Sequence, residues 1–247
     1  MGDRGHSWGE EKTDASTDAV EAAWAASSAV REFSGIHRTI RGLTLLLLPA
    51  VLRSRSDDRK RTRAVAEVIG FTVAGLRFHH SLEDDDYWPA IVANGADQAS
   101  LEPLIVEHHQ LIPILDGLAA QTQALVKDPG DRLALSSCQT LFQELADHLV
   151  VHLDHEEPIF FPLLAQHLPD AQAHALALKA AKSAPRKGFS WIMAGATYAM
   201  RPREADEFLR SLPKPLVWSR PLLLRSYRRN CRALGIDPTG LSRADAT

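Results

Sequence analysis

The stretch Phe78-His-His-Ser-Leu-Glu-Asp-Asp-Asp-Tyr-Trp-Pro89 occurs a second time, in altered form, as Val151-His-Leu-Asp-His-Glu-Glu-Pro-Ile-Phe-Phe-Pro162. An offset of 73 residues aligns the two copies without a gap, pairing His79 with His152 and Glu83 with Glu156. A His and a Glu four residues apart lie on one face of an α-helix, about one turn apart. Each copy therefore directs an imidazole and a carboxylate to one point, and the duplication predicts a two-metal site.

The composition is that of an ordinary globular protein. The chain has 247 residues, 45% of them hydrophobic, a formal net charge of −3 and a pI near 6.4. These values predict a sizeable core and argue against a nucleic-acid partner, which usually requires a strong basic excess.

The cysteines and the apolar segments indicate the cellular compartment. Cys138 and Cys231 lie far apart without CxxC spacing, so neither a disulfide framework nor a thiolate metal site is expected. The N-terminus has no apolar signal segment, and the longest apolar run, residues 43–52, is too short to span a bilayer. We therefore expect a cytoplasmic protein.

The pattern of apolar residues predicts an all-α fold. Residues 1–16 are polar and are expected to be disordered, and helices are expected over 17–53, 59–92, 100–127 and 132–167. Asn94-Gly95 and the turn Asp128-Pro-Gly-Asp separate the later helices, and Pro158 and Pro162 are expected to kink or end the last one. Long helices with short connections predict an antiparallel up-down four-helix bundle spanning residues 17–168.

The remaining residues, 169–247, are expected to form a C-terminal helical extension that packs on the bundle. Helical pieces near 171–183, 188–200, 203–211 and 216–233 alternate with prolines. Residues 201–232 carry nine Arg or Lys against three acids, interleaved with large apolar residues. This basic, amphipathic pattern suits either docking on the bundle or an anionic membrane surface, and frequent Trp and Leu at helical spacing favour docking.

Two further histidines fit the same duplication. His37 and His109 each precede apolar residues at helical spacing, so the four helices supply His, HxxxE, His and HxxxE in order. A single core histidine is more often a packing residue than a ligand, but four at related positions favour a metal site. Two buried glutamates would also cost several kcal/mol without a cation.

This series of elements resembles the hemerythrin-like, or HHE cation-binding, family over roughly residues 30–168. The resemblance implies a non-haem di-iron site with an oxo or hydroxo bridge and bridging carboxylates from Glu83 and Glu156. It implies terminal imidazole ligands from His37, His79, His109 and His152. Oxygen-carrying members have a fifth His one turn before the ligand of the third helix, where this chain has Ile105. The resemblance thus implies a near-symmetrical site that reacts with oxidant instead of carrying oxygen reversibly.

Other residues near the site keep alternative roles. His80 and His108 are neighbours of proposed ligands and point about 100° away on a helix, so register favours His79 and His109 without excluding them. His148 is a candidate extra ligand or a supporting or core residue, and Tyr87 is expected to pack. His155 is expected to face outward or to hydrogen-bond an acidic neighbour.

The function expected from this ligand set is binding of dioxygen or reaction with hydrogen peroxide at an iron pair. A ligand set of imidazole and carboxylate suits iron but also accepts zinc or manganese. The alternatives are a non-catalytic iron or oxygen sensor and a metal-free or zinc-bound interaction scaffold. An organic substrate, a reductant and the oligomeric state do not follow from the sequence.

Overall fold

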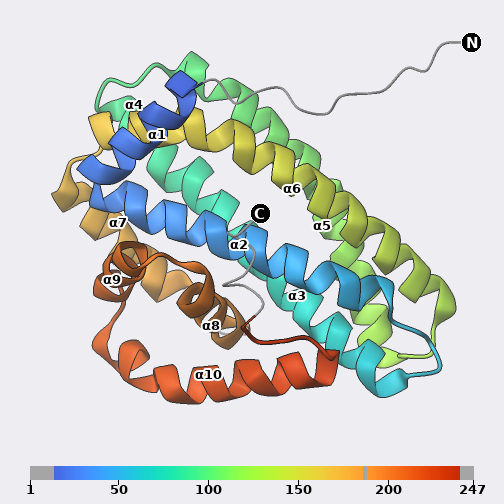
Figure 1. The fold of residues 1–247 in the computed structure, drawn as a ribbon. Coiled ribbons are helices and arrows are strands. Elements are labelled where there is room, and N and C mark those ends of the chain that lie inside the picture. The colour runs from blue at the N-terminus through green and yellow to red at the C-terminus, as the bar shows by residue number, and fades with distance from the viewer. Residues whose placement is uncertain (1–13, 186–187, 240–247) are drawn as a thin grey trace, which may run out of the picture.

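The computed structural model describes residues 14–185 and 188–239, and every element in these ranges is a helix. The segment 1–16 expected to be disordered lies outside the described residues up to position 13, and residues 14–16 begin the first helix. The long helices run beside one another, short helices lie at one end, and the C-terminal helices lie along one side (Figure 1).

The first expected helix is interrupted at Ser27. Helix α1 covers Asp14–Ala26 and α2 covers Ser28–Leu52. Ser27 has extended backbone angles, φ −118° and ψ 131°, and its hydroxyl accepts a hydrogen bond from the backbone N–H of Val30. A serine in this role caps the start of a new helix, so the chain changes direction before α2.

The second expected helix forms without a break, but a π-helical turn interrupts its α-helical hydrogen bonding. Helix α3 covers Arg59–Leu82, a π-helical turn η1 covers Glu83–Tyr87, and α4 covers Trp88–Ala93. Asp58 caps α3 through the backbone N–H of Arg61, and Gly95, with φ 100°, lies in the turn after α4. The π-helical turn begins at the glutamate of the first repeat copy.

The third and fourth long helices follow the expected ranges closely. A short 3₁₀ turn, η2, covers Gln98–Ser100 and leads into α5, Glu102–Lys127, while α6 covers Arg132–His167. Pro158 and Pro162 do not end α6, which contrasts with one of the two sequence expectations for these prolines. Asp131 caps α6 by accepting from the backbone N–H of Ala134.

Helices α2, α3, α5 and α6 pack in a ring, with α2 and α5 each contacting both α3 and α6. The apolar core of this ring has two parts. One contains Phe33 and Phe160, and the other contains Leu43 and Leu149. On α2 His37 lies between Phe33 and Leu43, and on α6 His152 and Glu156 lie between Leu149 and Phe160. The polar residues of the repeats are therefore enclosed between two apolar layers.

The C-terminal extension consists of α7 (Asp170–Ser183), α8 (Phe189–Ala199), α9 (Pro202–Ser211) and α10 (Lys214–Leu234). Helices α7, α8 and α9 pack on α2, and α8 and α10 pack on α3 (Figure 1). Glycines permit the close approach: a Cβ on Gly75 of α3 would lie 2.7 Å from Ile192 of α8. A Cβ on Gly195 of α8 would lie 2.8 Å from Leu43 of α2.

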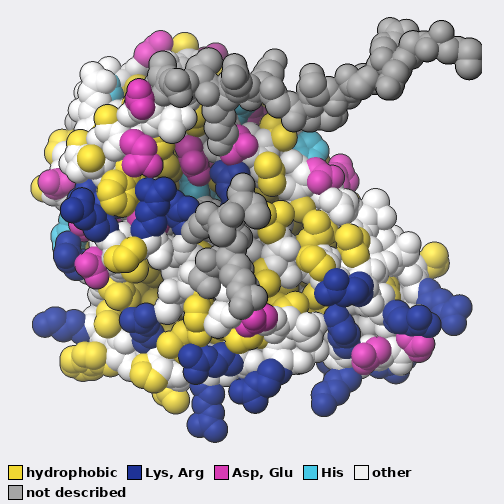
Figure 2. All heavy atoms as spheres, viewed as in Figure 1, with side chains coloured by type: hydrophobic (Ala, Val, Ile, Leu, Met, Phe, Trp, Pro, Cys, Tyr) yellow, Lys and Arg dark blue, Asp and Glu magenta, His cyan; other side chains and the backbone are white. Residues whose placement is uncertain are grey.

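Two helices, α2 and α10, have features that are also found in membrane-associated helices. Among the described residues, only α2 has the length and hydropathy of a membrane span, and half of its most apolar window is buried in the protein. Core helices of soluble proteins pass the same criterion. Helix α10 exposes Trp218 and Leu222, and basic side chains gather along the edge that it forms (Figure 2).

Candidate metal centre

Seven side chains of the ring converge in two adjoining groups. The first, which we call the two-imidazole group, contains His37, His79, Glu83 and Glu156, and the second, the three-imidazole group, contains His80, His108 and His152. All seven are buried, and within each group one potential ligand atom per residue lies within 4.8 Å of the others. Both groups draw their residues from helices far apart in sequence.

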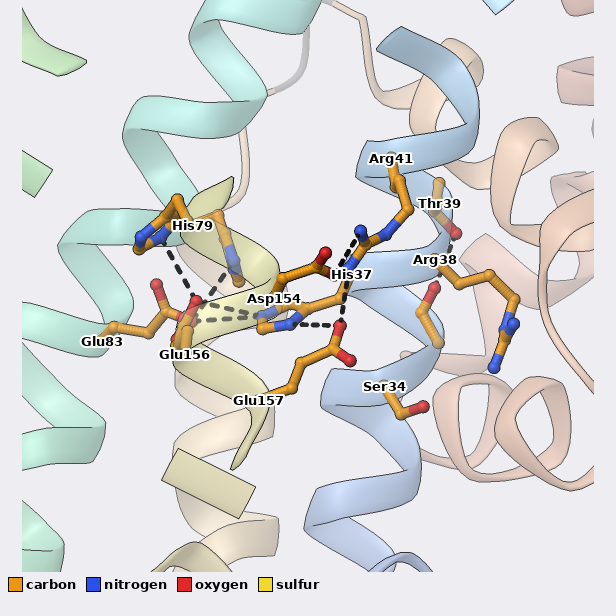
Figure 3. Close-up of polar contacts among 12 residues, drawn as sticks. Ser34, His37, Arg38, Thr39, Arg41, His79, Glu83, Asp154, Glu156 and Glu157 are labelled. Carbon is orange, nitrogen blue, oxygen red and sulfur yellow. Dashed lines mark hydrogen bonds and ion pairs between the residues drawn. The ribbon is translucent and has the colours of Figure 1, made fainter. Parts of the chain in front are cut away.

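In the two-imidazole group, the carboxylates face the imidazoles at contact distance. Nε2 of His79 lies 3.2 Å from Oε1 of Glu83, the i,i+4 pair expected from the repeat. Nε2 of His37 lies 3.6 Å from the same oxygen and 3.8 Å from Oε2 of Glu156. Figure 3 shows the two glutamates pointing toward one another with His37 and His79 beside them.

In the three-imidazole group, the rings are stacked and crossed. The rings of His80 and His108 stack with centroids 4.2 Å apart, and His152 meets both of them edge-on. Trp88 stacks on the other side of His108 at 4.7 Å, so this imidazole is fixed between two flat rings.

The two glutamates connect the groups. Oε2 of Glu83 lies 3.8 Å from Nε2 of His108, and Oε2 of Glu156 lies 3.3 Å from Nε2 of His152. Each carboxylate therefore faces imidazoles of both groups. The two groups therefore form one continuous cluster with the carboxylates between the imidazoles.

The atoms that face the centre of the cluster lack hydrogen-bond partners among the described residues. They are Nε2 of all five histidines and both carboxylate oxygens of Glu83 and Glu156. Buried polar atoms are nearly always hydrogen-bonded, because leaving one unpaired costs on the order of 1–3 kcal/mol. Nine such atoms aimed at one place have the chemistry of a metal site, since each is a potential ligand.

The pKa shifts of the buried residues also favour a cation site. Burial and the nearby Glu156 carboxylate raise the pKa of Glu83 well above its usual range. Burial disfavours the charged form of His37, but Glu156, Glu157 and Glu83 outweigh it and raise its pKa to about 10. Burial likewise opposes ionisation of Glu156, but His37 and His152 hold its pKa below the usual range. Without metal, protons on Glu83 and His37 balance the charge that cations would otherwise balance.

A shell of outer carboxylates orients the imidazoles. Asp84 contacts Nδ1 of His108 at 2.9 Å, and Glu107 contacts Nδ1 of His152 at 2.9 Å. Glu157 lies 3.4 Å from Nδ1 of His37. A carboxylate at Nδ1 keeps the proton there and leaves Nε2 to bind a metal.

These outer carboxylates reflect the duplication as well. Asp84 and Glu157 occupy the same position in the two repeat copies, one residue after the glutamate, and each contacts the one cluster histidine of another helix. Glu157 is itself contacted by Arg41 at 3.4 Å, and Arg41 also contacts Asp154 at 2.8 Å (Figure 3). The repeat therefore duplicates a cluster glutamate together with a carboxylate that supports a histidine of another helix.

The π-helical turn begins at Glu83 and occurs in only one of the two copies. The backbone N–H of Trp88 donates to the carbonyl of Glu83, five residues earlier. This wider turn carries Asp84 and places Tyr87 against Phe33, with ring centroids 4.6 Å apart. Such turns within α-helices are frequent at functional sites. Tyr87 is buried in this aromatic contact, as expected for a packing residue.

The structure brings five of the six sequence-predicted ligands together and leaves the sixth outside the cluster. His37, His79, Glu83, His152 and Glu156 lie in the cluster as listed above. His109 does not, because it is exposed on α5, and its neighbour His108 is buried in the cluster instead. One residue corresponds to about 100° of rotation on a helix, which separates core from solvent.

Sequence signals for the correct register on α5 exist. His108 lies four residues after Leu104 and three before Leu111, and both leucines are fully buried. His80, which the sequence left open, lies four residues after the buried Leu76, so it shares the core face with His79. His148 is exposed. His155 faces outward and contacts Glu107 at 2.9 Å, as expected.

These observations agree with the comparison to known families. The family described as the Hemerythrin HHE cation binding domain matches residues 28–164 of the chain. The chain belongs to this family. Comparisons with curated proteins and with solved structures gave no match.

The hemerythrin match places the site and the extension in different parts of the chain. Residues 28–164 include all seven residues of the cluster and the outer carboxylates Asp84, Glu107 and Glu157. Helices α7 to α10 lie beyond the match. The metal-binding character is thus a property of the family domain, and the extension is an addition to it.

Proposed function

We propose that this hemerythrin-family protein holds two iron ions and binds dioxygen or reacts with hydrogen peroxide at them. The observation that carries the proposal is the set of nine buried ligand-type atoms, five imidazole nitrogens and four carboxylate oxygens, without hydrogen-bond partners among the described residues. Imidazole and carboxylate together suit iron, and such a pair supplies redox chemistry when it is bound.

The distribution of ligands makes the two metal positions unequal. Two six-coordinate metals have twelve positions, of which five imidazoles and two bridging carboxylates fill nine and an oxo or hydroxo bridge two. One position stays open, and it belongs to the two-imidazole group of His37 and His79. The near-symmetrical site implied by the sequence would instead leave a position open on each metal, because it lacks His80.

The unequal site alters the expected choice between oxygen carriage and oxidant reaction. A near-symmetrical site favoured reaction with oxidant, whereas one open position at the two-imidazole end fits dioxygen binding and peroxide reaction alike. Residues of the chain position His37 and shield it from solvent beside that open position. Glu157 holds the Nδ1 side of His37, while Phe33 and Phe161 cover its ring at centroid distances of 6.2 Å and 5.3 Å and exclude water.

Metal analysis and spectroscopy test the proposal. Protein purified without oxygen is expected to contain about two irons per chain and, after oxidation, to show the ultraviolet-visible bands of an oxo-bridged pair. Zinc alone, or no metal after supply of iron, would contradict the proposal. Stopped-flow mixing of the di-ferrous protein with air-saturated buffer and with hydrogen peroxide then separates the reactions. A spectrum reversed by removing oxygen indicates carriage, and consumption of peroxide indicates oxidant chemistry.

A further inference from the structure

A cavity of about 140 Å³ lies between the family domain and the C-terminal extension. Helices α2 and α3 form one wall, and α7, α8 and α9, together with Ala184, Pro185, Met200 and Leu212 beside them, form the other. About half of the residues around it lie beyond residue 164, outside the family match. The extension therefore creates this space on the side of a bundle that already contains the metal site.

The cavity is lined almost entirely by apolar side chains, including Ile36, Leu76, Ile192 and Phe208. Two threonines also line it, but their hydroxyls donate to their own helices: Thr39 to the carbonyl of Gly35 at 2.8 Å, and Thr72 to that of Val68 at 3.1 Å. The space thus offers apolar contact over most of its surface and few groups to hold water.

One residue of the metal cluster lines the cavity. His79, whose Nε2 faces Glu83, also borders this space. His79 belongs to the two-imidazole group, where the coordination count leaves a position open. A molecule in the cavity would therefore lie beside an imidazole of the cluster.

A single carboxyl group gives the cavity a polar side. Glu32 lines it, and Oε1 of Glu32 accepts a hydrogen bond of 2.9 Å from the hydroxyl of Ser211, another lining residue. Burial raises the pKa of Glu32 to about 7, so near neutral pH this group exists both as an acid that donates and as a carboxylate that accepts. Glu207 adds to the increase through its charge.

We propose that this cavity binds a small, predominantly apolar organic molecule of about the size of benzene, with one hydrogen-bonding group directed to Glu32. The volume supports this size, because an engineered apolar cavity of about 150 Å³ in another protein stays dry and binds benzene. An apolar space with one convergent polar group is also the usual form of a small-molecule site. Binding itself does not depend on iron; only the role of the molecule beside an open metal position rests on the proposed function.

The test uses the full-length protein of measured metal content, with toluene and benzyl alcohol as probes in isothermal titration calorimetry. We expect saturable binding of about one molecule per chain, with benzyl alcohol bound more tightly than toluene because its hydroxyl reaches Glu32. The zinc-loaded protein should bind each probe with the same affinity as the iron-loaded protein does. Binding with no iron-dependent reaction would thus retain the cavity proposal while contradicting the proposed function.

Two variants on α7 form a matched pair. Ala181 lines the cavity and Ala175 is exposed on the same helix, so A181F fills the space and A175F does not. A181F should weaken both probes at least tenfold, and A175F should leave them unchanged. Glu32→Leu should remove the preference for benzyl alcohol and keep toluene binding.

A variant with a larger cavity guards against a folding defect in A181F. Ile36→Ala enlarges the space from the α2 side and should increase the affinity for naphthalene relative to toluene. Absence of saturable binding by toluene and benzyl alcohol in folded, metal-loaded protein would overturn the proposal. Binding that A181F leaves unchanged, or uptake of xenon alone, would overturn it as well.

Discussion

The two ends of the metal cluster differ although a duplication produced their central motifs. In the three-imidazole group, the rings of His80 and His108 stack on each other, and Trp88 stacks on His108. The outer carboxylates of this group come from Asp84 and Glu107. In the two-imidazole group, the outer carboxylate of Glu157 lies beside His37, and His79 borders an apolar cavity. One end is enclosed by protein side chains, and the other adjoins an apolar cavity.

The difference arises from two changes within the repeat. His80 of the first copy aligns with Leu153 of the second, which supplies a fifth imidazole on one side only. The π-helical turn at Glu83 has no counterpart after Glu156, where α6 continues as an α-helix. A duplicated ligand pattern therefore need not give a symmetrical site, because single substitutions decide how many imidazoles each group contains.

Removing a bridging carboxylate should have the largest effect, because it affects both ends at once. Glu83→Ala and Glu156→Ala are each expected to lose more than one of about two metals, since a bridge contacts both positions. Inductively coupled plasma mass spectrometry of the purified variants measures this. Glu144→Ala, an exposed position on α6, is the control and should keep its metal. Full metal content in both bridge variants would show that the glutamates are not bridges.

The register of α5 decides which histidine completes the three-imidazole group. His108→Ala should lose about one metal per chain, because this imidazole lies between His80 and Trp88 and faces Glu83. His109→Ala should keep the full content, since that side chain is exposed. The same metal analysis applied to both variants checks the prediction, and the reverse result would restore the sequence register.

The outer carboxylates allow the two ends to be weakened separately. Asp84→Asn should reduce metal affinity at the three-imidazole end, and Glu157→Gln at the two-imidazole end, each by roughly 10–100-fold. Competition with a chelator measures the affinities, and Asp85→Asn, exposed in the same π-helical turn, is the control. Equal weakening of both metals by either variant would mean that the ends do not act separately.

Metal binding should become tighter as pH rises, by roughly tenfold per pH unit for each proton released. In the metal-free protein His37 has a pKa raised from its ordinary 6.5 to about 10, so between these values it carries a proton that metal must displace. Its contribution to metal-free stability is accordingly complete below pH 6.5 and lost as pH rises through about 10.

Titrations in buffers of different ionisation enthalpy count the released protons. Glu157→Gln should reduce the count and the pH dependence, because Glu157 helps to hold the proton on His37. A count that stays the same in this variant, or metal binding that does not vary between pH 7 and about 9, would contradict the pKa of His37 described here.

Replacing His80 should have the smallest effect on metal affinity and should make the two ends of the cluster more alike. His80→Leu gives the first copy the residue that the second has at Leu153. The other six residues of the cluster remain, so we expect about two metals at roughly tenfold lower affinity and a second open position. Azide binding followed by absorption spectroscopy should give two sites per metal pair where the unaltered protein gives one. One site in both proteins would show that His80 is not a ligand.

Most of the helical content and much of the cluster could be predicted from the sequence. The i,i+4 spacing of His79 with Glu83 and of His152 with Glu156 places each pair on one helix face whatever surrounds it. The turn at Asp128-Pro-Gly-Asp and the prolines of the extension likewise locate helix ends, because their backbone restrictions are local. Local geometry is therefore what the sequence determined by itself.

Features that depend on packing between helices were decided only by the tertiary structure. The choice of His108 over His109 follows from the rotation of α5 about its axis, which Leu104 and Leu111 fix by packing against the other helices. The inclusion of His80 requires α3 to present two adjacent residues to one centre, and a π-helical turn has no strong sequence signal. The cavity at His79 exists because α7 to α9 pack on α2 and α3 at a distance set by side chains such as Ile192. Such distances arise from contacts between segments far apart in sequence, and no local pattern records them.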